Sequence, residues 1–196
     1  MSLHSNRRFR IGLDCDGVIY NFVDTLRQWI HESTGKRLES MPDANTWNFF
    51  SDQWGLSFEE YKNATIAGID AGYIFGQGKP IDGAIEAIRS LSHDYEIIIV
   101  TSRSGFGLRY EQCRLNTIKW LLEHDIWFDG LIFAEDKTNR GIDILLDDAP
   151  HQIGNAVAVD ERVVVFDQLW NQNVEHQDRV MDWEDFELYV RNRFPV

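Results

Sequence analysis

Short apolar runs alternate with amphipathic stretches along most of this chain. Each run has apolar side chains at consecutive positions, as strands covered on both faces of a sheet do. We therefore expect strands at residues 9–13, 96–100, 130–134, 143–147 and 162–166. Because helix patterns separate most of these runs, the alternation predicts an α/β protein built on a Rossmann-like parallel sheet.

The amphipathic stretches carry apolar residues three and four positions apart, the period of a helix with one buried face. In residues 18–34 this spacing relates Phe22, Leu26 and Ile30, and Gly35 is well placed to end the helix. Further helices are expected at residues 82–92, 108–124, 151–159 and 183–194.

One interval interrupts the alternation of strands and helices. Residues 36–78 contain no apolar run typical of a strand, but Ser57 and Glu60 have the spacing of a capping box that begins a helix. A structureless loop of this length is uncommon inside a compact domain. The sequence therefore predicts a small helical cap, residues 36–78, inserted into an α/β catalytic core formed by residues 1–35 and 79–196.

The composition of the chain limits which binding partners and which cellular compartment are expected for the protein. The chain has 196 residues and a formal net charge of -13 at pH 7, which disfavours binding to nucleic acids and to anionic membranes. Neither an N-terminal signal segment nor an apolar run long enough to cross a membrane is evident. Two cysteines, Cys15 and Cys113, are too few for a disulfide framework. We therefore expect a cytoplasmic protein.

Polar side chains follow four of the predicted strands, at the point where each strand ends. They are Asp14 and Asp16 after the first strand, Thr101, Ser102 and Arg103 after the second, Asp136 and Lys137 after the third, and Asp147 and Asp148 at the end of the fourth. Parallel strands have their carboxyl ends at one edge of the sheet, where open α/β proteins bind ligands. We therefore expect these side chains to converge.

The chemistry of this group indicates a metal and a phosphate. Carboxylates that lie close together raise one another's pKa unless a cation neutralises them. Oxygen ligands without a histidine or cysteine cluster suit Mg²⁺, which often completes its shell with phosphate oxygens. A lysine and a hydroxyl group nearby suit a phosphate as well, and a carboxylate can act as the nucleophile by forming an aspartyl-phosphate. The expected partner is a small phosphomonoester, with Mg²⁺ as the cofactor.

These segments resemble the four motifs of the haloacid dehalogenase superfamily of phosphotransferases, in the same order and at fitting separations. The resemblance spans about residue 9 to residue 148, and Lys137 lies eleven residues before Asp148, an interval that the 5'(3')-deoxyribonucleotidase family shares. The segments that resemble this narrower family are LDCDGVIYNF, GYIFGQGKPIDGAIEAI, VTSR, EDKT and LLDDAP. The resemblance implies a Mg²⁺-dependent phosphatase of nucleoside monophosphates, with 5'(3')-deoxyribonucleotides as substrates and an aspartyl-phosphate intermediate.

The resemblance also implies a role for each matching residue. Asp14 would be the nucleophile, and Asp16 would be the general acid for the leaving alcohol and then the base for the hydrolytic water. Mg²⁺ would be held by Asp14, by the backbone carbonyl of Asp16 and by Asp148, with Asp147 in a supporting position.

Further residues would hold the substrate. Thr101, Ser102 and Lys137 would bind the transferring phosphoryl group, Phe22 would line the nucleoside pocket, and the cap would close over the substrate and exclude water. Arg103 departs from the family, whose members have proline after the threonine and serine. An extra cation at this edge would support the site and favour a more anionic substrate.

Other interpretations remain open at this stage. The same chemistry suits sugar phosphates or other small phosphomonoesters, and the fold also suits a non-catalytic phosphate-binding regulator. The complete set of motif residues disfavours the regulator. Asp147 has an alternative role as a helix cap, Phe22 as a core residue and Arg103 as a surface ion pair. A homodimer is possible, and the sequence does not decide it.

Overall fold

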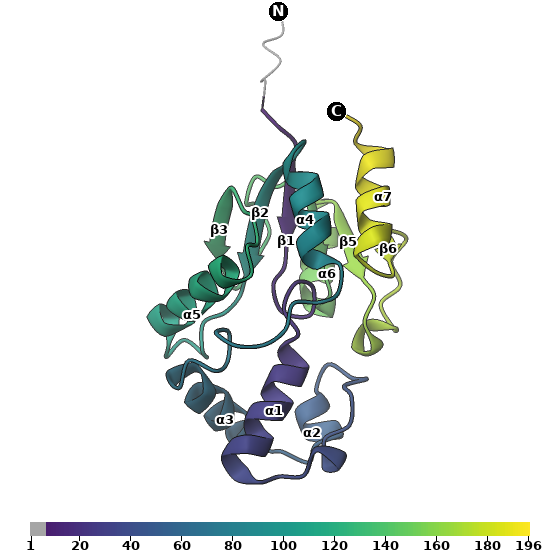
Figure 1. Cartoon of the computed structure of the whole chain (residues 1–196). Coiled ribbons are helices and arrows are strands. Elements are labelled where there is room, and N and C mark those ends of the chain that lie inside the picture. The colour runs from purple at the N-terminus through teal and green to yellow at the C-terminus, as the bar shows by residue number, and fades with distance from the viewer. Residues whose placement is uncertain (1–6) are drawn as a thin grey trace, which may run out of the picture.

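A six-stranded sheet lies at the centre of the computed structural model, which describes residues 7–196 (Figure 1). Every pair of neighbouring strands in it is parallel. Its strands, in the spatial order β3-β2-β1-β4-β5-β6, are β1 (Arg10–Leu13), β2 (Glu96–Thr101), β3 (Gly130–Phe133), β4 (Ile144–Asp147), β5 (Val163–Phe166) and β6 (Arg179–Val180). The Rossmann-like α/β fold is therefore confirmed. The prediction about an N-terminal signal segment falls partly on residues 1–6, which lie outside the described residues.

Strand β1 occupies the middle of the sheet between β2 and β4. Ile11 and Leu13 are fully buried, because helices and loops cover both faces. Leu13 pairs in register with Ile99 of β2 and Leu146 of β4. The residues that directly follow these three strands are thereby brought to one edge of the sheet.

Helices connect the strands and cover the sheet. They are α4 (Ala84–Ser92), α5 (Tyr110–Glu123), α6 (Pro150–Ala158) and α7 (Trp183–Arg193), and each matches a predicted helix within two residues at either end. Helices α4 and α7 pack side by side (Figure 1). Strand β6 was not predicted, because two residues, one of them an arginine, give no apolar run.

The first helix, α1 (Phe22–Thr34), begins four residues later than predicted. The carbonyl of Cys15 accepts hydrogen bonds from the backbone N–H groups of Ile19 and Tyr20, so a turn occupies the start of the predicted range. Asn21 then caps the helix, since its side chain accepts a hydrogen bond from the backbone N–H of Asp24.

A helical lobe lies at the carboxyl edge of the sheet (Figure 1). Besides α1, it contains η1 (Leu38–Ser40), α2 (Phe49–Asp52) and α3 (Phe58–Asp70), and α1 packs against both η1 and α3. Ser57 and Glu60 form the predicted capping box at the start of α3. The division of the chain at residues 36 and 78 stays a prediction, and helix α1 shares the packing of the lobe.

The lobe joins the core through two segments that run side by side. The backbone N–H of Asn21 donates to the carbonyl of Lys79 over 3.1 Å, and the N–H of Ile81 donates to the carbonyl of Ile19 over 2.7 Å. The chain thus enters and leaves the lobe at one place. These bonds hold the two connecting segments together at the edge of the core.

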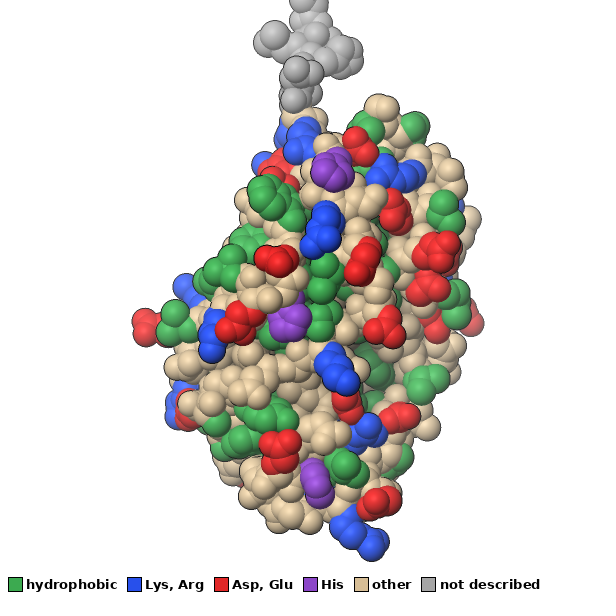
Figure 2. Space-filling model, in the orientation of Figure 1, with side chains coloured by type: hydrophobic (Ala, Val, Ile, Leu, Met, Phe, Trp, Pro, Cys, Tyr) green, Lys and Arg blue, Asp and Glu red, His purple; other side chains and the backbone are tan. Residues whose placement is uncertain are grey.

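Charged side chains of both signs are interspersed over the face shown in Figure 2, with apolar side chains between them. This face therefore shows no broad patch of a single charge. Within residues 7–196, no helix combines the length and the apolar character needed to cross a membrane.

Candidate active site

A tight turn follows Leu13 and positions Asp14 and Asp16. Gly17 has a φ of 83°, a left-handed conformation that residues with side chains rarely adopt. A Cβ on Gly17 would also lie 2.4 Å from a carboxylate oxygen of Asp148. The glycine therefore allows the turn to approach the end of β4, which brings the aspartates of two strands together.

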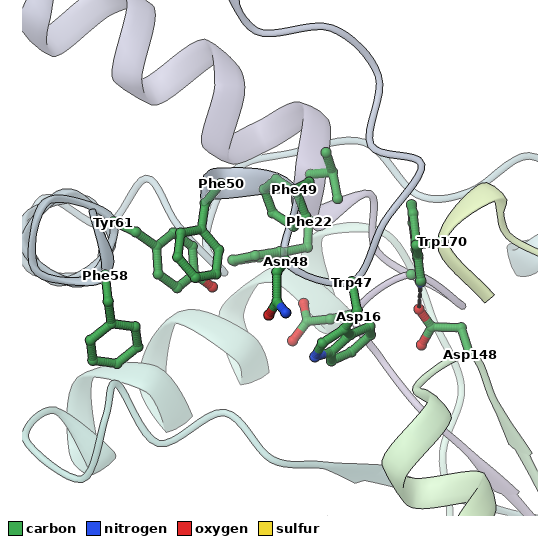
Figure 3. A pocket seen from close by; sticks show the side chains of 12 residues that line it. Asp16, Phe22, Trp47, Asn48, Phe49, Phe50, Phe58, Tyr61, Asp148 and Trp170 are labelled. Carbon is green, nitrogen blue, oxygen red and sulfur yellow. Dashed lines mark hydrogen bonds between the residues drawn. The ribbon is translucent and has the colours of Figure 1, made fainter. Parts of the chain in front are cut away.

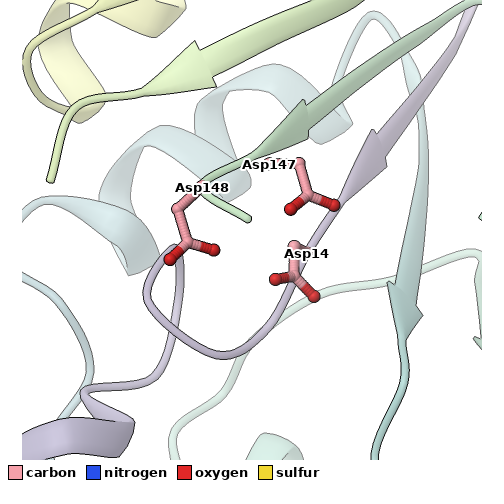
Figure 4. Close-up of side chains that lie close together, drawn as sticks. All are labelled: Asp14, Asp147 and Asp148. Atoms are coloured by element: carbon pink, nitrogen blue, oxygen red, sulfur yellow. The ribbon is translucent and has the colours of Figure 1, made fainter. Parts of the chain in front are cut away.

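Asp14, Asp147 and Asp148 form an acidic cluster at the ends of β1 and β4 (Figure 4). All three residues are buried, and each offers a carboxylate oxygen within 4.8 Å of the others. The ammonium group of buried Lys137 lies 2.6 Å from Oδ1 of Asp14 and 2.7 Å from Oδ2 of Asp147. Three strand ends thus contribute to a cluster of three carboxylates and one ammonium group.

The electrostatics of the cluster show that it lacks positive charge. The pKa of Asp14 is raised to about 7, chiefly by burial; Lys137 works to lower it, and the carboxylates of Asp147 and Asp16 work to raise it. Burial also raises the pKa of Asp148 well above its ordinary value, as do the charges of Asp14 and Asp147. Burial works to lower the pKa of Lys137, but the neighbouring carboxylates raise it overall. An added cation would relieve this imbalance.

Two buried oxygens indicate that the cluster fits such a cation. Oδ2 of Asp148 accepts a hydrogen bond of 2.8 Å from the indole N–H of Trp170, whereas Oδ1 of Asp148 finds no partner among residues 7–196. The hydroxyl of Thr101, at the end of β2, is likewise buried without a partner there. A buried polar group without a partner costs about 1–3 kcal/mol, and more when it is charged. Carboxylate oxygens suit a hard divalent metal ion, so the cluster fits one.

Asp16 does not join the acidic cluster. Its carboxylate accepts hydrogen bonds from Nε and Nη2 of Arg103, the shortest over 2.7 Å. The side chain of Asp16 is 28% exposed, whereas that of Arg103 is 0% exposed. The guanidinium therefore contacts Asp16 and leaves the carboxylate accessible from the cavities of the site.

A small cavity of about 260 Å³, which we call the cluster-side cavity, lies beside the cluster. Asp14, Asp16, Ser102 and Lys137 line it, and His151 of α6 lies at the same cavity. Burial lowers the pKa of His151, which favours the neutral form of its ring. The cavity thus unites both predicted catalytic aspartates with two of the predicted phosphate-binding residues.

A second cavity, of about 340 Å³, extends from Asp16 and Asp148 into the helical lobe (Figure 3). Its walls are mostly aromatic, from Phe22, Trp47, Phe49, Phe50, Phe58, Tyr61 and Trp170. Phe50 and Tyr61 stack with ring centroids 4.3 Å apart, and Phe22 stacks on Phe75 at 6.0 Å. Phe22 therefore lies at the cavity, and the rings around it form flat apolar walls.

Comparison with known proteins places this chain in a family. The model of the family "5' nucleotidase, deoxy (Pyrimidine), cytosolic type C" matches residues 7–194. The chain belongs to this family. A Chlorobaculum tepidum protein named "Putative 5'(3')-deoxyribonucleotidase" is 26% identical over 177 residues, which cover 89% of this nucleotidase and 86% of its relative. The chain is therefore a phosphatase of the 5'-nucleotidase class, with a small phosphate compound as substrate.

Solved structures show the same fold at low sequence identity. The haloacid dehalogenase-like hydrolase SP0104 from Streptococcus pneumoniae has a TM-score of 0.61 at 15% identity, over 93% of the nucleotidase and 98% of that chain. The HAD-hydrolase YfnB from Bacillus subtilis, bound to magnesium, has a TM-score of 0.61 at 13% identity, over 94% and 99%. The nucleotidase core is therefore haloacid dehalogenase-like.

Trp170, an aromatic residue of the candidate site, escaped the sequence analysis. Trp170 lies on η2 (Leu169–Asn171), just after β5, and Trp47 lies in the lobe before α2. Trp47 also contacts His151 edge to face, with ring centroids 5.4 Å apart. The sequence feature that could have identified Trp170 is its position after the fifth predicted strand, residues 162–166. An indole side chain by itself, however, indicates neither a metal site nor a phosphate site.

Proposed function

We propose that this nucleotidase is a Mg²⁺-dependent phosphatase of deoxynucleoside monophosphates that uses Asp14 as its nucleophile. The observation that carries the proposal is the position of the buried cluster of Asp14, Asp147 and Asp148. The cluster borders both the cluster-side cavity of about 260 Å³, which Ser102 and Lys137 line, and an aromatic cavity of about 340 Å³. A phosphate and an aromatic base need these two environments.

The metal site would consist of Asp14, Asp148 and the backbone carbonyl of Asp16. When bound, Mg²⁺ would stabilise the charge that develops on the phosphoryl oxygens. Asp147 would support the site, because its Oδ2 accepts from Lys137 and its Oδ1 accepts from the backbone N–H of Ala149. Oδ1 of Asp148, which has no hydrogen-bond partner among residues 7–196, favours this assignment.

The reaction would proceed in two displacements at phosphorus. A carboxylate oxygen of Asp14 bonds to phosphorus as the ester P–O bond breaks, and protonated Asp16 gives its proton to the leaving sugar oxygen. Ionised Asp16 then takes a proton from a water molecule. The water oxygen bonds to phosphorus, the bond to Asp14 breaks, and inorganic phosphate leaves.

The phosphoryl group would be held at the cluster-side cavity. Ser102 lines this cavity and is exposed, so its hydroxyl is free to donate to a phosphate oxygen. The hydroxyl of Thr101 lacks a partner within residues 7–196, and a phosphate oxygen would supply one. Lys137 would contribute positive charge while it holds Asp14 in place, since its ammonium group contacts that carboxylate.

The aromatic cavity supports a nucleotide over a sugar phosphate as the substrate. Stacking of a base on an aromatic side chain contributes about 1–3 kcal/mol. An apolar wall beside the sugar would leave a ribose 2'-hydroxyl without a partner, which disfavours ribonucleotides. The net charge of -13 disfavours polynucleotides. A cytoplasmic location and a possible homodimer stay predictions.

A comparison of three substrate classes tests the proposal. With saturating Mg²⁺, thymidine or deoxyuridine monophosphate is expected to exceed the matched ribonucleotides and hexose phosphates in kcat/KM. A tenfold preference for a hexose phosphate would overturn the nucleotide assignment and leave the phosphatase chemistry in place. An absence of turnover with every phosphomonoester would favour a phosphate-binding regulator instead.

A further inference from the structure

Arg103 is bound on every side by residues from separate parts of the chain. Its Nε and Nη2 donate to Asp16, and its Nη1 donates to Oγ1 of Thr117 on α5 over 3.0 Å. Its guanidinium carbon lies 4.6 Å from the ring centroid of Tyr20 and 4.4 Å from that of Phe75. The two rings and Thr117 fix the plane of the guanidinium, so its fork points at Asp16 in one orientation.

The Asp16 carboxylate depends on Arg103 for its side-chain hydrogen bonds, whereas Arg103 has other partners as well. Within residues 7–196, every hydrogen bond that the Asp16 carboxylate accepts from a side chain comes from Arg103. The backbone turn at Gly17 sets the position of the Asp16 backbone, but it does not fix the rotamer of the Asp16 side chain. A planar guanidinium that donates from two nitrogen atoms restricts that rotamer, which a single ammonium charge would do less well.

The complete burial of Arg103 argues against a direct role in substrate binding. Arg103 is among the residues that line the cluster-side cavity, but its side chain is 0% exposed and each of its three nitrogen atoms already contacts Asp16 or Thr117. To bind a second phosphate group of a more anionic substrate, the guanidinium would need N–H groups that are free and exposed to the cavity. The carboxylate of Asp16, by contrast, faces the cavities and is 28% exposed.

We propose that Arg103 is a positioning residue that holds the Asp16 carboxylate within hydrogen-bonding reach of the leaving oxygen of the substrate. This proposal rests on the proposed phosphatase function and on the role of Asp16 in it. It assigns to Arg103 a contribution to proton transfer that passes through Asp16 alone. Misplacement of a catalytic group by about 1 Å costs on the order of 10²-fold in rate.

Arg103 also lies where the helical lobe returns to the core. Phe75, which covers the guanidinium, has a φ of 66°, and its backbone N–H donates to the hydroxyl of Tyr20 over 3.0 Å. Phe75 stacks in turn on Phe22 at the aromatic cavity. The position of Asp16 is therefore linked by direct contacts to the aromatic residues that would meet the base.

The test compares substrates that differ in their need for a proton. Thymidine monophosphate must release an alkoxide that requires protonation, whereas p-nitrophenyl phosphate releases a phenolate that is stable without it. Arg103→Met keeps much of the volume between the two rings, and Arg103→Lys keeps the charge. The matched control is Arg114→Met, because Arg114 lies on α5 and its guanidinium also covers an aromatic ring, that of Phe133 at 5.4 Å, away from Asp16.

For Arg103→Met we expect kcat/KM to fall about 10²-fold with thymidine monophosphate and less than about threefold with p-nitrophenyl phosphate. Arg103→Lys should recover part of the loss, and Arg114→Met should change neither substrate. In an Asp16→Asn background, Arg103→Met should add no further loss, because its effect passes through Asp16.

Equal losses with both substrates would overturn the positioning role and indicate a general structural effect, as would a further loss in the Asp16→Asn background. If Arg103→Met does not fold, the ratio of the two substrates for Arg103→Lys decides the question in the same way. Failure of the unaltered protein to hydrolyse either substrate with Mg²⁺ would instead refute the proposed function itself.

Discussion

The indole N–H of Trp170 donates a hydrogen bond of 2.8 Å to Oδ2 of Asp148. Trp170 follows β5 and Asp148 follows β4, so the bond joins two neighbouring strand ends. It fixes one oxygen of the carboxylate while Oδ1 stays buried without a partner in the described part of the chain. Trp170 also lines the aromatic cavity, so one residue borders both the acidic cluster and the proposed place of the base.

Trp170→Phe is expected to weaken Mg²⁺ binding about 10- to 100-fold, because loss of a residue that orients a metal ligand typically has this effect. Isothermal titration calorimetry of Mg²⁺ without substrate measures the change directly. Trp127→Phe is the control, since Trp127 is 56% exposed and does not line the site. An unchanged dissociation constant for Trp170→Phe would show that Asp148 needs no orientation by the indole.

Asp14→Asn is expected to abolish turnover, because an amide oxygen is a poor nucleophile toward phosphorus. Asp16→Asn should reduce kcat by about 10²-fold or more, the usual scale of general acid–base catalysis. Steady-state kinetics with thymidine monophosphate measure both effects, with Asp125→Asn as an exposed control. Rates near those of the unaltered protein for a folded Asp14→Asn variant would contradict the assignment of the nucleophile.

The metal-free protein is expected to lose stability as the pH rises through about 7. The folded protein holds the pKa of Asp14 at about 7, mainly through burial, whereas the ordinary value is 3.8. A group with a raised pKa contributes its full stability below the ordinary value and loses it as the pH rises toward the folded value. Bound Mg²⁺ replaces the proton, so it should stabilise the protein more at pH 7.5 than at pH 5.5.

Thermal unfolding at these two pH values, in EDTA and in Mg²⁺, measures this linkage. The increase in Tm on adding Mg²⁺ should be larger at pH 7.5, and Asp125→Asn should leave this difference unchanged. An equal increase at both pH values would show that protons and metal do not compete for the cluster. Full turnover in EDTA would separately refute the metal requirement.

Trp47→Ala is expected to alter the choice of substrate more than the chemistry. Trp47 lines both cavities and is 44% exposed, so its truncation should spare the fold. Discrimination between thymidine monophosphate and a hexose phosphate should fall several-fold, whereas turnover of p-nitrophenyl phosphate should change little. Kinetics with all three compounds check this, and an unchanged ranking would count against a role for the lobe in selecting substrates.

The sequence predicted the convergence of the aspartates because that convergence follows from topology. Asp14 and Asp148 each follow an apolar run, and parallel strands end at one edge, so their meeting needs no knowledge of side-chain packing. Lys137 follows a third strand for the same reason. The start of α1 was harder to predict, because the apolar side chains of Ile19 and Tyr20 fit a helix and a buried turn equally well.

The contacts of Arg103 were beyond the reach of sequence patterns. Its partner Asp16 is 87 positions away, and the rings that cover it come from Tyr20 and Phe75, in two further segments. A surface ion pair and a buried one look alike in a sequence. What distinguishes them is the burial of the guanidinium, which depends on how the lobe packs on the core.

The neighbouring entry and exit of the helical lobe have a consequence for how such proteins can diversify. Because Asn21 and Lys79 are hydrogen-bonded to each other, the lobe forms a module whose two ends meet at one junction. The acidic cluster lies on the other side of that junction, on strands that do not pass through the module. A different set of aromatic residues can therefore be inserted at the same junction while the strands keep their register. Under the proposed function, exchange of this module in an evolving lineage would change the substrate preference while the inherited chemistry stays in place.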